Sequence, residues 1–110
     1  MRFLLVAALT AFASNHVIAA GNAEKGKAAF VTHGCWQCHG TVGQGGVAGK
    51  SLAPKPMAFE AFSVFVRHSN GPMPPYQKAV LSDADLADIH AYLQSIPAAK
   101  DYKSIPLLNQ

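Results

Sequence analysis

Apolar positions recur at helical spacing most clearly near the end of the chain, over residues 82–96. Ser82 stands three residues before Asp85 in a capping-box arrangement, and the acidic residues of this first turn suit the positive end of a helix. The apolar residues that follow share one helical face: Leu86, Ile89, Leu93 and Ile96. Pro97 cannot continue the helix. The pattern therefore predicts an amphipathic helix that ends just before this proline.

Two further segments carry a helical pattern, residues 22–34 and residues 58–68. In the first, Asn22 is a typical helix cap and Phe30 is one of the main apolar residues. In the second, apolar residues are spaced to bury one face: Phe59, Phe62, Phe65 and Val66. We expect this second helix to end at Ser69-Asn70-Gly71.

Glycine and proline dominate residues 41–56, which predicts a long loop of the kind that wraps around a cofactor. Residues 98–110 form an irregular tail with three apolar side chains, Ile105, Leu107 and Leu108. This tail is expected either to pack on the body or on a partner, or to be solvated and disordered.

The N-terminus has the features of a secretory signal peptide. Met1-Arg2 is a short positive start, Phe3 to Ala13 is apolar, and small residues lead up to a cleavage position after Ala20. Polar residues 14–16 interrupt the apolar stretch, which is too short to span a bilayer. The alternative is an uncleaved membrane anchor. The expected organisation is a signal peptide at 1–20, one domain at 21–97 and the tail at 98–110.

Cleavage after Ala20 would shorten the chain from 110 residues to 90 and remove Arg2, so the formal net charge of +3 would become +2. This charge is too small to indicate a nucleic-acid or anionic membrane partner. A domain of this size has a marginal core unless something large and apolar completes it.

The most informative motif is Cys35-Trp36-Gln37-Cys38-His39. C-x-x-C-H is the spacing at which two thiols attach to the vinyl groups of one porphyrin while the adjacent imidazole ligates the iron. The sequence therefore predicts one covalent haem c, held by Cys35 and Cys38, with His39 as an axial ligand. Export agrees with this prediction, because in bacteria haem is attached to reduced cysteines outside the inner membrane.

Three other interpretations of the two cysteines explain less. A thioredoxin-like redox pair requires a βαβ context, and no β-branched strand pattern flanks the motif. A structural zinc site requires four ligands, but the chain has no third cysteine and no matching pair of histidines. A disulfide between Cys35 and Cys38 would close too small a loop to stabilise much.

Met73 is our prediction for the second axial ligand. Pro72, Pro74 and Pro75 flank it, exclude helix and favour a rigid extended loop that projects one side chain. The alternative role for this methionine is core filling. Four other residues are weaker candidates on position alone: His33, Met57, His68 and His90.

With these features, the part of the chain after the leader resembles the class I cytochromes c, small monohaem electron carriers. Gly26 and Phe30 match the glycine and aromatic of that family's first helix, and Ile89 and Tyr92 match residues of its last helix. The resemblance implies an all-α fold of three to four helices wrapped around the haem, in which the first and last helices cross. It also implies that Arg67, on the approach to Met73, contacts a haem propionate.

One position departs from that family, which usually has a proline about a dozen residues after the ligand histidine, whose carbonyl orients the imidazole. Lys50 and Ser51 occupy this region and Pro54 comes later, so the acceptor for His39 is left open.

The resemblance implies a non-enzymatic periplasmic carrier that passes one electron between donor and acceptor proteins, without stable membrane insertion after cleavage. The short link from His39 to Met73 also resembles cytochromes that are subunits or partners of periplasmic dehydrogenases, and the alternative is a stably bound subunit of that kind. A haem sensor or small peroxidase would instead require an open sixth position.

Overall fold

The structure is a computed structural model that describes residues 20–110, and these contain α-helices and no strand. The predicted all-α class is therefore confirmed for this part of the chain. The helices run in the order α1 (Ala23–Thr32), α2 (Trp36–His39), α3 (Phe59–His68) and α4 (Asp83–Ser95), followed by the short 3₁₀ turns η1 (Tyr102–Ser104) and η2 (Pro106–Leu108). The predicted signal peptide lies outside the described residues except for Ala20.

The three predicted helices are present, and two of them begin at the predicted caps. The Asn22 side chain accepts a hydrogen bond from the Lys25 N–H at 2.9 Å, and the Ser82 hydroxyl accepts one from the Asp85 N–H at 3.0 Å. These side chains satisfy backbone donors that the first helical turn leaves without partners. The fourth helix, α2, was not predicted, because four residues are too few to show a helical period.

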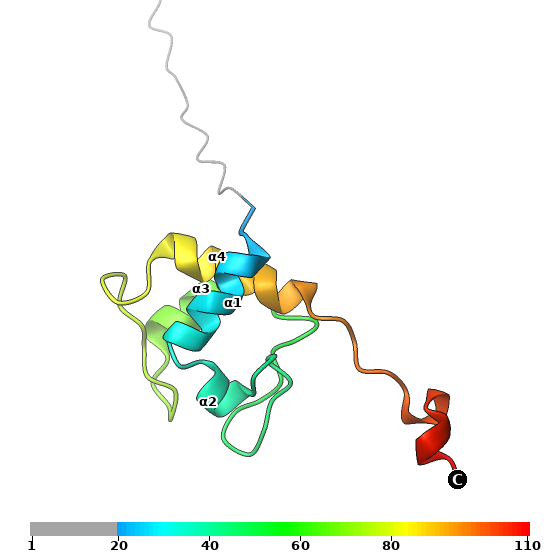
Figure 1. Cartoon of the computed structure of the whole chain (residues 1–110). Helices are drawn as coiled ribbons and strands as arrows, with labels where there is room; N and C mark the ends of the chain where they lie inside the picture. The colour runs from blue at the N-terminus through cyan, green and yellow to red at the C-terminus, as the bar shows by residue number, and fades with distance from the viewer. Residues whose placement is uncertain (1–19) are drawn as a thin grey trace, which may run out of the picture.

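The first helix, α1, crosses α4 at close range, as the resemblance implied (Figure 1). Gly26 makes this approach possible, since a Cβ there would overlap the Asp88 carbonyl and lie 2.9 Å from the Tyr92 Cβ. Beside it, the Phe30 and Tyr92 rings pack with their centroids 5.6 Å apart. The Asn22 N–H also donates to the Asp88 carboxylate at 2.6 Å, so the crossing is held by both packing and a charge-assisted hydrogen bond.

We expect Gly26→Ala to destabilise the domain by about 1–3 kcal/mol, because the added methyl group must push α1 away from α4. Denaturant unfolding followed by circular dichroism measures the change. Gly71→Ala is the matched control, since nothing lies within 4 Å of the Cβ position at Gly71. Equal stability of the two variants would contradict the close crossing.

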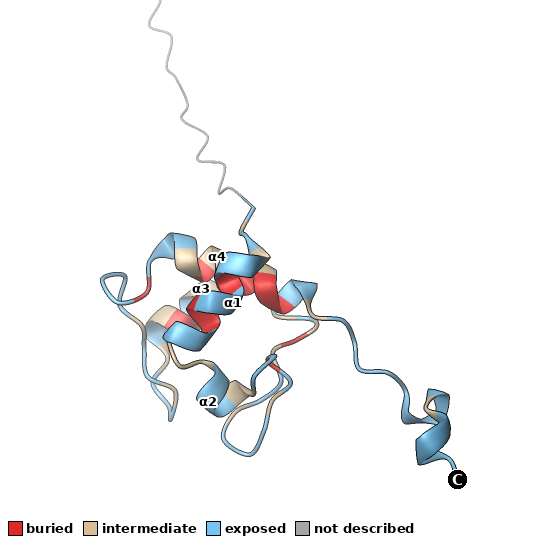
Figure 2. Cartoon of the chain, in the orientation of Figure 1, coloured by how far each residue is buried: buried red, intermediate tan, exposed pale blue. Residues whose placement is uncertain are grey.

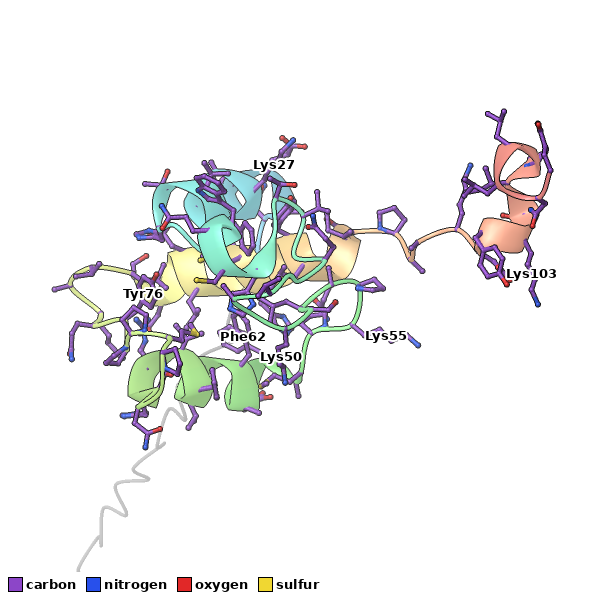
Figure 3. All side chains as sticks on the ribbon, turned by 90° about the horizontal axis from the view of Figure 1, so that it is seen from below. Lys27, Lys50, Lys55, Phe62, Tyr76 and Lys103 are labelled. Atoms are coloured by element: carbon purple, nitrogen blue, oxygen red, sulfur yellow. The ribbon has the colours of Figure 1, made fainter. Side chains whose placement is uncertain are left out.

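The core lies where α1, α3 and α4 meet, and Figure 2 shows most of the buried residues there. Phe62 points from α3 toward α4 (Figure 3). The buried apolar residues are Ala29, Phe30, Ala53, Phe62, Val66, Leu81, Leu86, Ile89, Tyr92 and Leu93. Most of α2, the 41–56 loop and the tail lie outside this core.

The C-terminal tail extends away from the body (Figure 1). Leu107 and Leu108 are exposed, and Ile105 is only half-buried. The Asn109 amide donates to the carbonyls of Tyr102, Lys103 and Ile105, so the tail folds on itself. None of the helices within residues 20–110 is long and apolar enough to cross a membrane.

Candidate functional site

The short helix α2 gathers the three residues of the C-x-x-C-H motif on one turn. Cys35, its N-terminal cap, already has helical dihedrals, so Cys38 and His39 follow it at i+3 and i+4. Residues at these spacings share one face of a helix, which places the two sulfurs and the imidazole side by side. The glycines on either side, Gly34 and Gly40, have φ values of +75° and +80° that allow the sharp turns into and out of this helix.

The imidazole of His39 is oriented by the backbone of the following loop. Its Nδ1 lies 2.8 Å from the carbonyl oxygen of Lys50. A carbonyl only accepts hydrogen bonds, so Nδ1 carries the proton and donates it, and Nε2 of the neutral ring is left with a free lone pair. The acceptor that the sequence left open is therefore the Lys50 carbonyl, and it serves where the family uses a proline carbonyl.

Glycines allow this loop to pack closely on the motif. A Cβ at Gly49 would lie 2.8 Å from the Cys38 carbonyl oxygen and 3.0 Å from His39 Nδ1. The Gly45 N–H donates to the His39 carbonyl at 2.7 Å, with φ at +87°. The glycine-rich loop therefore fixes the position of the imidazole as well as connecting helices.

The two cysteines are free thiols in different surroundings: Cys35 is half-buried and Cys38 is exposed. Burial raises the pKa of the Cys35 thiol to about 11, and a backbone hydrogen bond offsets only part of that rise. Cys35 is thus a neutral thiol at pH 7, whereas a thioredoxin-type cysteine requires a lowered pKa. Within residues 20–110, no group of three histidine, cysteine or acidic side chains could hold a metal ion.

The loop that carries Met73 is joined to the segment just before the motif. The Tyr76 hydroxyl donates to the His33 carbonyl at 2.8 Å, two residues before Cys35. Burial raises the pKa of Tyr76, with smaller contributions from Cys35 and Cys38, so its hydroxyl keeps its proton. Met73, Tyr76 and Cys35 all pack, partly buried, against the same apolar core.

The other candidate sixth ligands have different surroundings. His90 is buried, with Nε2 2.9 Å from the Met57 carbonyl and its ring packed on Phe59 and Phe62. Its contacts are those of a satisfied core histidine. His68 is exposed at the end of α3, and the Met57 side chain is more than a third exposed. Met73 stays our prediction for the sixth ligand.

Comparison with protein families identifies one match over residues 21–93, with a family described as cytochrome c oxidase, cbb3-type, subunit III. The match covers about two thirds of the chain, including the motif and all four α-helices except the end of α4. The chain belongs to this cytochrome c family. No curated protein and no solved structure matches the chain.

Membership in this cytochrome c family confirms the resemblance and makes the chain a haem c electron-transfer protein. The donor set fits that cofactor. Two unpaired thiols stand three residues apart on one helical turn, and the Lys50 carbonyl holds Nδ1 of the adjacent imidazole, which leaves Nε2 as the ring nitrogen available to a ligand. Cys35, Cys38 and His39 are the residues that would hold a covalent haem in this cytochrome.

Arg67 has mostly protein partners in this cytochrome. Its Nη1 donates to the carbonyls of Tyr76 at 2.9 Å and Leu81 at 2.7 Å, and its Nη2 donates to the Asp83 carboxylate at 2.8 Å. Its Nε is buried and has no hydrogen-bond partner among residues 20–110. The predicted contact with a propionate would therefore rest on Nε and the second Nη2 hydrogen, and it stays a prediction.

Sequence reasoning missed three participants of this site: the Lys50 carbonyl, Tyr76 and Asp83. A backbone acceptor leaves no side-chain signal, although Lys50 lies at about the spacing where the family has its proline. Tyr76 directly follows the Met-Pro-Pro run, and an aromatic residue there was a usable signal. The sequence indicated Asp83 only as an acidic residue in the first turn of a predicted helix. Hydrogen bonds from Lys78 and then Arg67 lower its pKa, so it is ionised at neutral pH.

Proposed function

We propose that this cytochrome transfers one electron at a time between redox proteins through a single haem c attached at Cys35 and Cys38. His39 and Met73 are the proposed axial ligands. The observation that carries this proposal is the turn of α2, where both thiols stand beside an imidazole whose Nδ1–H is held by the Lys50 carbonyl. When bound, the haem supplies the Fe(III)/Fe(II) couple.

The chain's own residues would set how that couple behaves. Because the Lys50 carbonyl fixes the His39 ring, the imidazole keeps one orientation and gains basicity. A thioether ligand from Met73 favours Fe(II) and so raises the reduction potential. With both axial positions filled, substrates have no access to the iron, and the proposed carrier is not an enzyme.

Electron exchange is proposed at the face around Cys38. Cys38 is exposed, and exposed apolar side chains lie on α2 and in the loop that packs against it: Trp36, Val42 and Val47. A small, partly apolar face suits weak docking, which allows fast release of the partner.

The first test concerns the covalent bonds of the wild-type protein. We expect the haem to stay with the polypeptide through acid-acetone extraction, because two thioether bonds survive denaturation. The mass of the purified protein should correspond to a chain that begins near Gly21 with one haem added. Extraction of free haem would disprove covalent attachment. A mass that includes Met1 would show that the leader is not cleaved and serves as a membrane anchor.

The alternative function is that of a cytochrome subunit bound stably to a larger redox complex, such as a periplasmic dehydrogenase. Two observations favour it: the matched family is described as an oxidase subunit, and the tail presents exposed Leu107 and Leu108. Gel filtration of the native extract distinguishes the two, since a free carrier elutes near the mass of one chain. The proposed location in both cases is the periplasm.

A further inference from the structure

The loop between α3 and α4, residues 69–82, has few hydrogen-bond donors of its own. Pro72, Pro74 and Pro75 have no backbone N–H, so the segment around Met73 cannot form a regular hydrogen-bonded structure. A loop of this kind keeps its shape only when groups elsewhere in the protein hold its carbonyls and side chains.

Arg67, on the last turn of α3, holds two carbonyls of this loop. Its Nη1 bridges the carbonyls of Tyr76 and Leu81, which lie after Met73 and at the end of the loop. Its side chain is only 10% exposed, so these are largely buried, charge-assisted hydrogen bonds. The planar guanidinium reaches both carbonyls at once and also meets a carboxylate, which an ammonium on a flexible chain does less well.

Two further residues, Asp83 and Tyr76, fix the arrangement. Asp83, the first residue of α4, receives Arg67 Nη2 at 2.8 Å, which joins α3 to α4. Lys78 Nζ also lies 2.8 Å from the Asp83 carboxylate, but the Lys78 side chain is 74% exposed, so this surface ion pair adds little. On the other side, Tyr76 donates its hydroxyl to the His33 carbonyl and its N–H to the Val66 carbonyl. Tyr76 is therefore held from α3 and from the segment that leads into the haem motif.

We infer that Arg67 and Tyr76 are positioning residues that hold Met73 in place as the sixth ligand, Arg67 by clamping the loop to α3 and α4 and Tyr76 by joining it to His33. This inference rests on the proposed ligation by Met73. It assigns Arg67 a role in the stability of the iron–sulfur bond that is separate from any contact with a propionate.

The test uses the holoprotein with two substitutions, Arg67→Lys and Tyr76→Phe. Arg67→Lys keeps the positive charge but loses the planar guanidinium that donates to two carbonyls at once. Tyr76→Phe removes only the hydroxyl that reaches His33. Each variant should open the Met73 loop roughly tenfold more often, because it loses buried hydrogen bonds. The expected readouts are a weaker iron–sulfur absorption band in the oxidised protein and binding of CO to the reduced protein, with the haem still attached.

Lys78→Gln is the matched control. It removes one of the two partners of Asp83 and leaves every Arg67 hydrogen bond in place, so its spectrum and CO exclusion should match the wild type. Hydrogen exchange gives a readout that does not depend on the iron. In Arg67→Lys, exchange should be faster at the Tyr76 N–H, while amides of α1 and α4 should keep their protection and so show that the domain remains folded.

The outcomes separate the clamp from the ligation. The clamp is overturned if the Tyr76 N–H of Arg67→Lys exchanges at the wild-type rate, or if the iron–sulfur band is undiminished in both variants. A role of Arg67 toward a propionate alone would give this result. A wild-type protein that lacks the iron–sulfur band overturns ligation by Met73, and the clamp with it. Faster exchange at Tyr76 together with a weakened band supports both.

Discussion

Met73→Ala is expected to keep its haem but to lose much of its reduction potential. Attachment survives because Cys35, Cys38 and His39 are unchanged, while the sixth position is left to water or hydroxide, which stabilises Fe(III) better than a thioether. The fall should be a sizeable share of the roughly 0.8 V over which axial ligands set haem potentials. CO and cyanide should bind readily, and spectroelectrochemistry with ligand titration measures both effects.

Two companion variants sharpen this result. Met57→Ala is the control, because Met57 is the other methionine of the domain, and its potential should equal that of the wild type. Met73→His should give a haem that excludes CO but has a low potential, since imidazole stabilises Fe(III) more than a thioether does. If Met73→Ala keeps the wild-type potential and still excludes CO, Met73 only fills space, and His68 and His90 become the ligands to test.

The second large effect is expected for Cys35→Ala combined with Cys38→Ala. Without thioether bonds the chain should lose its haem on extraction, and the protein should be largely unfolded. The reason is size: the apolar core is confined to the junction of α1, α3 and α4, while α2 and the 41–56 loop bury little of their own. A bound group that stabilises only the native state then contributes a large share of the folding free energy.

Far-ultraviolet circular dichroism of the double variant checks this expectation. Gln37→Ala is the matched control, because it alters an exposed residue of α2 between the two cysteines and should leave both haem content and helicity unchanged. A native helical spectrum in the double variant would show that the polypeptide folds without its cofactor.

The sequence was most informative where local chemistry determines structure. Asn22 and Ser82 predicted two helix starts because a cap acts within three residues of itself, and Pro97 correctly limited α4. The motif predicted which residues lie together because a single turn of helix contains all three. Gly26 could be matched to Tyr92 only through the family resemblance, since nothing local to either residue indicates a crossing.

The remaining features depend on contacts between distant parts of the chain. The acceptor for His39 is a backbone carbonyl eleven residues away, and any residue type can supply one. Arg67 reaches partners nine to sixteen residues along the chain, and Tyr76 reaches His33 from 43 residues away. Such pairings follow from how the loop folds back, so the family resemblance could suggest a role for Arg67 but not these partners.

The crossing of α1 over α4 also determines when the domain can close during its synthesis. The Asn22 N–H and its Asp88 partner are 66 residues apart, so α1 lacks the helix it packs against until nearly the whole domain has emerged. Cys35 packs against the core that α4 completes, and its burial there raises the pKa of its thiol. Closure thus lowers the thiolate fraction of Cys35. The interval before α4 arrives is therefore when the Cys35 thiol is most open to modification, whereas Cys38 stays exposed in the closed fold as well.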